Sequence, residues 1–508
     1  MSPGSKPCSS GGGSSAAEPN RRAQTEPPRA DVPGEVKQST MLRKKRPRDE
    51  GSAKDPDNAG THATPGRRVL IECTYTHLYG GNTGIQRAVR NICSISGEVG
   101  AKLGIECLPV IHHHRGFRPI RNVARRPLGA RLLEELIPLR IYLRRGYFLL
   151  AALLAAIFPY PAASRFLFAP TRQFGLMAIL KTALKVPLFP LLLTYLKKPP
   201  RARPGDVLIL LDSSWHLNIW SAVAEARKDG AHVVAAIYDL IPLTHPHFCV
   251  PEHVQSFTAW MQEACGHADS FIAISDTVRR ELTRYLKSNP SLRHAADKRS
   301  DYFHLGANVD HSKPVGKVRR AVQEAFSGTD APSTYLTVGT IEPRKNHSYL
   351  LDAFDRIWQR RPDVRLCIVG GKGWSCEDIW HRIQNHPGLG KRLFMFNNLS
   401  DAELAYCYSR ARALIFPSRV EGFGLPLVEA LYHRLNVLAS DIPAFREIAA
   451  EHCVFFDIQS PDSLVKIVLD FEATGRLPLP KNPETFTWPD WRETCESLLT
   501  KALALSKG

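Results

Sequence analysis

The stretch that decides the fold is residues 413–431, which read ALIFPSRVEGFGLPLVEAL. It begins with an apolar strand, turns through a glycine-rich loop and enters a helix with Pro426 in its first turn. Gly422 and Gly424 leave the loop amides open to a ligand, and the helix N-terminus behind them favours negative charge. The stretch therefore predicts a strand-loop-helix unit that can hold an anionic group.

Two carboxylates, Glu421 and Glu429, lie on either side of this turn. Glu421 falls in the loop, and Glu429 falls about one helical turn inside the helix. Ionised carboxylates accept hydrogen bonds from neutral hydroxyl groups, and a sugar nucleotide offers both hydroxyls and phosphate. The alternative is a buried unit with two incidental acids, and a second loop upstream argues against that alternative.

The second loop lies in residues 333–346, which read STYLTVGTIEPRKN. A strand ends at Gly339, and Arg344 and Lys345 come just before a helical pattern over 347–361. Arginine presents a planar fork and lysine a compact charge, so the pair suits a diphosphate. Either residue alone would more often be a solvated surface charge. Together with the glutamate pair downstream, the two cations predict a site for a sugar nucleotide.

Strands and helices alternate on both sides of residue 320, which predicts an α/β protein with two doubly wound, Rossmann-like parallel sheets. The apolar run 206–211 is typical of a strand covered on both faces. The predicted strands are 68–73, 206–211, 232–237 and 270–274 in the first sheet, and 334–338, 364–369, 393–396, 413–416, 436–439 and 453–456 in the second.

We expect four regions along the chain. Residues 1–66 are rich in Gly, Ser and Pro and read as a disordered basic tail. Residues 67–310 form the N-terminal domain, interrupted by an insert at about 113–204, and residues 311–485 form the C-terminal domain. Residues 486–508 read as a terminal helix.

At these residues the chain resembles the retaining glycosyltransferases of family 4, which have the GT-B fold with two domains facing a cleft. The matching segments are 339–346, 421–429 and 439–448, and a weaker match at 82–90 (NTGIQRAVR) resembles bacterial mannosyltransferases of surface polysaccharide synthesis. The resemblance covers roughly residues 67–500 and implies that the terminal helix packs back on the N-terminal domain.

The resemblance also implies roles for single residues. Arg344 and Lys345 would stabilise the departing diphosphate, and Glu429 would bind the ribose hydroxyls. The donor sugar would be held by Glu421 together with the backbone of Gly422, Phe423 and Gly424. Gly339 would border the donor, and members of this fold need no bound metal.

The N-terminal domain would contribute the acceptor side. Gly81 and Gly84 lie in a glycine-rich loop after the first strand and would let the backbone approach the phosphates. Asp239 ends a strand where doubly wound sheets place their sites, and we assign it a catalytic role, although it could equally cap the following turn. Many family members have a histidine near this strand end, whereas this chain has Tyr238 there.

The net charge of +18 is not spread evenly. Residues 115–204 contain 17 basic and two acidic residues, and residues 1–68 contain 13 basic and eight acidic ones, so the rest is near neutral. Residues 146–164 carry no charge, but their continuous apolar core is shorter than the roughly 20 residues of a spanning helix. The insert therefore predicts peripheral attachment to an anionic membrane surface. A spanning or re-entrant segment and a buried helix between the domains are the alternatives.

The remaining sequence features indicate the cellular compartment. Eleven cysteines without a CxxC pair favour a reducing compartment and argue against a zinc site or a disulfide framework. No secretory signal is apparent, and Met41 leaves open whether residues 1–40 are translated. We expect a cytoplasmic protein at the inner face of the cell membrane. The basic run 43–48 could bind nucleic acid, but it has no structured basic domain beside it.

These observations predict a hexosyltransferase that transfers a sugar from a nucleotide sugar to a glycan or lipid-linked acceptor in polysaccharide synthesis, without a cofactor, a metal or nucleic acid. The donor expected from the resemblance is GDP-mannose. A UDP-sugar donor is the near alternative, and a sugar-nucleotide epimerase of GT-B fold is another. Release of nucleoside diphosphate on addition of an acceptor would separate a transferase from an epimerase.

Overall fold

The computed structural model of the protein describes residues 66–81, 83–113, 116–121, 123, 200–307, 316–327 and 333–507. The chain separates into two compact units, residues 1–62 and 63–508, and every described residue belongs to the second. The predicted tail lies outside the described residues, and so does the part of the predicted membrane insert from 124 to 199.

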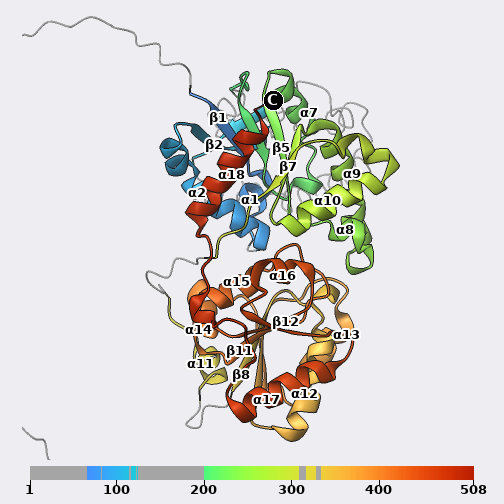
Figure 1. Ribbon diagram of the computed structural model, residues 1–508, viewed down its shortest axis with the longest axis vertical. Coiled ribbons are helices and arrows are strands. Elements are labelled where there is room, and N and C mark those ends of the chain that lie inside the picture. Colours follow the sequence, from blue (N-terminus) through green and yellow to red (C-terminus); the bar gives the residue numbers. More distant parts are fainter. Residues whose placement is uncertain are drawn as a thin grey trace, which may run out of the picture. The chain divides into compact units, whose positions relative to one another are not determined.

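The first sheet has seven strands in the order β3-β2-β1-β4-β5-β6-β7 (Figure 1). All neighbouring strands are parallel except β2 and β3. Every residue of β1, β4 and β6 is buried, as expected for strands covered by helices on both faces. The strands are β1 (Arg68–Glu72), β2 (Glu106–His113), β3 (Gly116–Pro119), β4 (Val207–Leu210), β5 (His232–Ile237), β6 (Ser270–Ala273) and β7 (Ser300–Tyr302).

The helices of this part of the chain connect the strands. The long helix α2 begins with a capping box, in which Thr83 and Gln86 satisfy each other's backbone amides. The elements are α1 (Thr74–Tyr79), α2 (Gly84–Lys102), α7 (Trp220–Lys228), α8 (Ile241–Thr244), α9 (Pro251–His267) and α10 (Asp276–Ser288), with the 3₁₀ turns η2 (Ser214–His216), η3 (Pro246–Phe248) and η4 (Pro290–Ala295).

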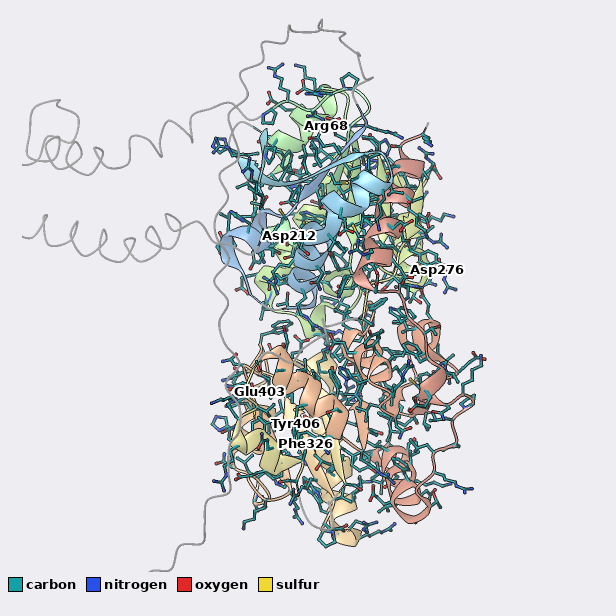
Figure 2. All side chains as sticks on the ribbon, turned by 90° about the vertical axis from the view of Figure 1, so that its left-hand side faces the viewer. Arg68, Asp212, Asp276, Phe326, Glu403 and Tyr406 are labelled. Carbon is teal, nitrogen blue, oxygen red and sulfur yellow. The ribbon has the colours of Figure 1, made fainter. Side chains whose placement is uncertain are left out.

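The two ends of the central strands differ in chemistry (Figure 2). At the amino end, Arg68 of β1 pairs with Asp206 before β4, with Nη2 and Oδ2 2.5 Å apart in a buried position. At the carboxyl end, Asp212 follows β4 and accepts hydrogen bonds from the backbone and hydroxyl of Thr76. Polar groups thus hold the first loop after β1 at the end where doubly wound sheets carry their sites.

The second sheet has six parallel strands in the order β10-β9-β8-β11-β12-β13. Its strands are β8 (Thr334–Val338), β9 (Arg365–Val369), β10 (Leu393–Phe396), β11 (Ala413–Phe416), β12 (Val437–Ser440) and β13 (Cys453–Phe456). The helical elements are α11 (Arg320–Ala325), η5 (Pro343–Lys345), α12 (His347–Arg360), α13 (Glu377–Gln384), α14 (Asp401–Arg410), α15 (Leu425–Tyr432), α16 (Pro443–Ala449), α17 (Pro461–Thr474) and η6 (Pro483–Thr485).

The last helix, α18 (Trp491–Leu505), follows the second sheet in the chain. It packs against α2, β4 and β7 of the first sheet, and Figure 1 shows it in red beside α2. Its apolar face is buried there, including Cys495, Leu498 and Leu499. Helix α18 therefore contributes to the hydrophobic core around the first sheet, although it follows the second sheet in the chain.

The prediction of two doubly wound α/β sheets is confirmed, and the predicted strands match to within about two residues. The sequence interpretation missed β2, β3 and β7. Pro109 and two histidines interrupt the apolar pattern of β2, and β7 is a short polar strand at the sheet edge. Without a continuous apolar run, none of the three carries the signal of a buried strand.

Candidate active site

The predicted cations and the loop glutamate meet at one place beside the second sheet. η5 carries Arg344 and Lys345, and the loop after β11 carries Glu421. Arg344 Nη1 lies 2.6 Å from Glu421 Oε2, and Lys345 Nζ lies 2.5 Å from Glu421 Oε1. Parallel β8 and β11 are neighbours in the sheet, so the loops at their carboxyl ends are adjacent.

These three charges are largely buried, and their pKa values respond to one another. Burial by itself would raise the pKa of Glu421, but Arg344 and Lys345 lower it to about 2. Burial opposes the charge of Arg344, yet Glu421 and nearby carboxylates raise its pKa. For Lys345 burial dominates, and its pKa is lowered despite Glu421. The cluster is an ionised carboxylate that two cations share away from bulk water.

A further carboxylate, Glu342, also contacts Arg344. Glu342 Oε1 lies 2.6 Å from Arg344 Nη2, so the guanidinium bridges Glu342 and Glu421. Glu342 is 3% exposed, and among the described residues its Oε2 has no hydrogen-bond partner. Burial raises the pKa of Glu342, while Arg344 opposes that rise. The sequence interpretation gave this glutamate no role.

The glycines of the loop permit close backbone approach. A Cβ on Gly422 would lie 2.2 Å from the carbonyl oxygen of Tyr238, which follows β5 of the first sheet. Gly424 has φ of 107° and is the N-cap residue of α15, and a Cβ there would meet the ring of Phe445. Phe423 between them is 3% exposed, so this part of the loop is buried.

Asp239 lies beside this cluster but has a structural partner. Its Oδ1 accepts a hydrogen bond from the Ile241 amide at 3.0 Å, as the turn-capping alternative predicted. Burial raises the pKa of Asp239, and Arg344 opposes the rise. The same carboxylate can cap the turn and face the cations, so its catalytic role stays a prediction. His245, by contrast, hydrogen-bonds Thr244 and stacks on Phe248 as a loop residue.

Glu429 is held by two partners that the sequence interpretation did not assign. Its Oε1 lies 2.6 Å from Nη2 of Arg87 on α2, and its Oε2 accepts a hydrogen bond of 2.9 Å from Tyr408. Glu429 is 2% exposed. Because Glu429 is also buried, ribose hydroxyls could reach its carboxylate only if neighbouring groups moved.

The remaining predicted glycines lie at the ends of elements. Gly81 has φ of 90°, and a Cβ there would overlap the Gln86 side chain that caps α2. A Cβ on Gly84, the first residue of α2, would lie 3.3 Å from Leu425 Cδ1, so the N-termini of α2 and α15 approach each other. A Cβ on Gly339 would lie 3.4 Å from Lys345 Cε.

The structure thus brings Arg344, Lys345, Glu421 and Gly339 together, and it places Glu429 in a separate polar contact. Glu342, Arg87 and Tyr408 are the site residues without a predicted role. Arg87 could have been found, because it lies in the quoted segment 82–90. Tyr408 lies in an ordinary amphipathic helix pattern that marks no chemistry.

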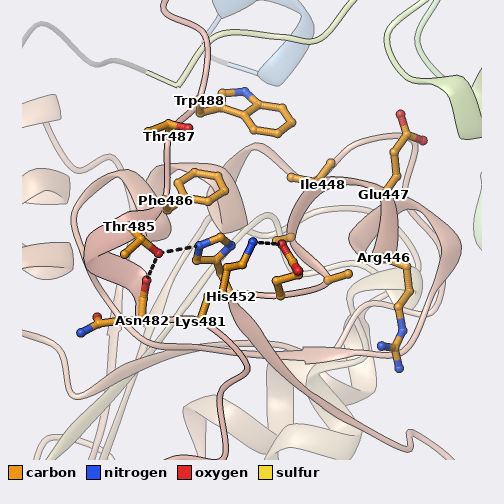
Figure 3. A pocket seen from close by; sticks show the side chains of 13 residues that line it. Arg446, Glu447, Ile448, His452, Lys481, Asn482, Thr485, Phe486, Thr487 and Trp488 are labelled. Carbon is orange, nitrogen blue, oxygen red and sulfur yellow. Dashed lines mark hydrogen bonds and ion pairs between the residues drawn. The ribbon is translucent and has the colours of Figure 1, made fainter.

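A cavity of about 640 Å³ lies away from these residues, between α16 and the segment before α18 (Figure 3). Lys481 and Glu451 pair across it at 2.5 Å, and His452 contacts Thr485. Trp488 closes one side of the cavity. The arginine and lysine side chains of this cavity are paired with carboxylates, as Arg344 and Lys345 are, but the residues that line the cavity do not include the glycine-rich loop before α15.

Glu447 of α16 makes an anchoring contact with the first sheet's helices. Its carboxylate accepts hydrogen bonds from the amides of Asp276 and Thr277, at the N-terminus of α10, and from the Thr277 hydroxyl. His304 Nε2 lies 3.0 Å from the same carboxylate. Burial would raise the pKa of Glu447, but these donors lower it to about 2. The residue acts as a helix cap supplied from another part of the chain.

Two further observations concern membranes and metals. Among the described residues, no helix combines the length and the apolar character needed to cross a bilayer. Within the same ranges, no three His, Cys, Asp or Glu side chains are grouped so that they could hold a metal ion.

Part of the chain is similar in sequence to known glycosyltransferases. Residues 321–483 match the family Glycosyl transferases group 1. The serotype-specific mannosyltransferase WbdA of Escherichia coli is 35% identical over 300 residues, which are 58% of this chain and 36% of that protein. The O-antigen chain mannosyltransferase B of Escherichia coli is 25% identical over 46% of this chain and 60% of its own length. The chain therefore spans little more than a third of the WbdA relative.

A solved structure described as "Trehalose-6-phosphate from E. coli bound with UDP-2-fluoro glucose" covers 86% of this chain and 96% of its own, with 12% identity and a TM-score of 0.49. The predicted relation to glycosyltransferases is confirmed for the C-terminal part of the chain. The matched residues 321–483 hold Arg344, Lys345, Glu421 and Glu429.

Proposed function

We propose that the protein is a glycosyltransferase that moves a sugar from a nucleotide sugar to a glycan or lipid-linked acceptor in polysaccharide synthesis. The observation that carries this proposal is the convergence of Arg344 and Lys345 on Glu421 within the matched domain. Two buried cations beside a glycine-rich helix start suit a diphosphate leaving group. Relatives described as mannosyltransferases support the reaction class.

The residues divide the chemistry among them in this proposal. As the bond between sugar and phosphate breaks, negative charge grows on the diphosphate, and Arg344 and Lys345 stabilise it. Glu421 keeps both cations in place and accepts hydrogen bonds from donor hydroxyls once the diphosphate shares those cations. The absence of side chains at Gly422 and Gly424 lets the loop pack against Tyr238 and Phe445 beside these cations. Retention of anomeric configuration belongs to the proposal and is checked by NMR of the product.

We further propose GDP-mannose as the donor, because relatives that are 34–35% identical are described as mannosyltransferases. A UDP-sugar is the second candidate. The reaction uses no metal or other cofactor in this proposal, and addition of EDTA leaves the rate unchanged. The predicted attachment of residues 113–204 to an anionic membrane, at the inner face of the cell membrane, is also part of the proposal, and flotation with anionic vesicles tests it.

A two-stage experiment tests the function. First, thermal unfolding of the purified protein is measured with GDP-mannose, GDP, UDP-glucose and UDP, and the matching donor raises the melting temperature. Second, that donor is incubated with a mannose-terminated oligosaccharide or lipid-linked glycan, and release of nucleoside diphosphate is followed. Release that depends on the acceptor supports a transferase and excludes an epimerase. No stabilisation by any nucleotide and no release with any acceptor would remove the proposal.

A further inference from the structure

The cations proposed to bind the diphosphate are already surrounded by carboxylates. Arg344 contacts Glu342 and Glu421, each at 2.6 Å, and Lys345 contacts Glu421 at 2.5 Å. Asp239 is close enough for its charge to affect the pKa of Arg344. Two cations thus face three acidic side chains. A diphosphate that binds here brings further negative charge against groups of the same sign.

Of these three carboxylates, Glu342 has the fewest contacts that stabilise its ionised form. Glu421 has a cation on each oxygen, which keeps its pKa at about 2. Asp239 accepts a backbone amide. Glu342 has Arg344 on one oxygen, while its buried second oxygen has no hydrogen-bond partner among the described residues. Such a buried carboxylate, with one oxygen unpartnered in the described part of the chain, is protonated most readily when its partner cation also binds another anion.

Several other titratable groups lie around Glu342. Lys345 and Glu421 influence Glu342 from η5 and from the loop after β11. Two thiols also lie within electrostatic range, Cys249 after η3 and Cys376 before α13. Burial raises the pKa of both thiols, that of Cys249 to about 11, so both already carry their protons near neutral pH.

We propose that Glu342 is a further donor-site residue, which takes up one proton from solvent when the diphosphate of a nucleotide sugar binds to Arg344. The carboxylate becomes a neutral carboxyl group, and no other bond forms or breaks. The carbonyl oxygen of the neutral Glu342 still accepts the hydrogen bond from Arg344, so the guanidinium stays in position. The positive charge of Arg344 then pairs with the phosphate. This inference rests on the proposed function, since it needs a diphosphate at Arg344.

The direction of the pH dependence follows from this exchange. The pKa of Glu342 is higher with diphosphate bound than without it, so binding is strongest below the pKa of the free protein. Affinity then falls about tenfold per pH unit between the two pKa values. The diphosphate itself gives the opposite sign near its own second pKa of about 6. Measurements at about pH 8 therefore report protein groups alone.

Isothermal titration calorimetry with GDP, and separately with UDP, tests the proposal. Titrations at about pH 8 in two buffers of different ionisation enthalpy give the number of protons taken up on binding. The wild-type protein takes up a measurable fraction of a proton. Glu342→Gln, which keeps the shape and loses the charge, takes up almost none, and its affinity varies little with pH. Asp239→Asn is the matched control and retains the uptake.

Each outcome decides between defined possibilities. Nucleotide binding without proton uptake in the wild type overturns the inference and leaves the proposed function standing. Equal uptake in Glu342→Gln, or its loss in Asp239→Asn, also overturns the inference. Absence of binding to either nucleotide overturns the proposed function and this inference with it. If Glu342→Gln does not fold, infrared difference spectra of wild-type protein with carbon-13-labelled glutamate show whether a glutamate becomes protonated on GDP binding.

Discussion

At the scale of single residues, Glu421 matters most because two buried cations depend on it. Glu421→Gln leaves Arg344 and Lys345 without their shared counter-charge, and breaking such a buried pair costs about 3–5 kcal/mol. We expect a lower melting temperature in the variant and a larger stabilisation by GDP or UDP than in the wild type, because diphosphate replaces the lost charge. Thermal unfolding with and without nucleotide measures both, and equal stabilisation in the two proteins would contradict the argument.

Lys345 supplies the second cation, and its loss should affect the reaction more than the fold. Lys345→Ala removes stabilisation of the leaving diphosphate and should slow sugar transfer by roughly 10²–10³-fold, with the circular dichroism spectrum unchanged. Lys481→Ala is the control, since Lys481 pairs with Glu451 at an exposed position and should keep the wild-type rate. Wild-type rates in both Lys345→Ala and Glu421→Ala would remove the site assignment.

The residues that the sequence could identify are those whose chemistry is local. Arg344, Lys345 and Glu421 occur in short segments beside glycine and proline, so their loops are recognisable without a structure. The contacts of Arg87 and Tyr408 with Glu429 join residues that lie 342 and 21 positions apart in the chain. No local pattern encodes such a pairing, which depends on how α2, α14 and α15 pack.

At the scale of elements, the loop before α15 requires a glycine for reasons of space. A Cβ on Gly422 would lie 2.2 Å from the Tyr238 carbonyl oxygen, so Gly422→Ala must displace the loop from the end of β5. Because a shift of about 1 Å near a reacting centre can cost roughly 100-fold in rate, we expect at least a tenfold loss of transfer activity. Gly371→Ala, whose Cβ meets nothing within 4 Å, should leave the rate unchanged.

The cap that Glu447 provides to α10 should appear in the pH dependence of stability. Its pKa is depressed to about 2, so its contribution is present above about pH 5 and is lost as the pH falls toward 2. Glu447→Gln should lower the free energy of unfolding by about 1–3 kcal/mol at pH 7, with the difference from wild type shrinking in acid. Urea unfolding at several pH values measures this.

Glu451→Gln serves as the control for that experiment. Glu451 lies four residues further along and pairs with Lys481 at the surface, where solvent screens the ion pair and its contribution to stability is small. A difference between Glu447→Gln and wild type that stays constant from pH 7 to pH 3 would show that the carboxylate charge does not hold the helix end.

Elements were predictable where burial on both faces left a continuous apolar run, as in β4 and β11. The strands that the sequence interpretation missed share one physical cause. β2 is a longer strand with only three of its eight residues buried, and β3 is paired antiparallel to it at the sheet edge. Strands of this kind are specified by their neighbours rather than by their own hydrophobic pattern.

At the scale of the whole molecule, the chain returns to its beginning. α18 supplies core residues to the first sheet although the entire second sheet precedes it in sequence. The hydrophobic core around the first sheet is therefore incomplete without α18. The terminal helix was predictable from its pattern, but its partner was expected only from the resemblance, because an amphipathic face does not specify what it packs against.

This arrangement predicts where a weakened core will open. Leu498→Ala in α18 creates a cavity at a fully buried position and should cost about 2–5 kcal/mol. Hydrogen exchange measured by mass spectrometry should then increase in α2, β4 and β7, which pack against α18, and far less in β8 to β13. Leu464→Ala in α17, equally buried, is the matched variant and should give the reverse pattern, with exchange rising in α12. If Leu498→Ala instead raised exchange mainly in the second sheet, α18 would belong to the core that precedes it, and the return of the chain to its first sheet would be wrong.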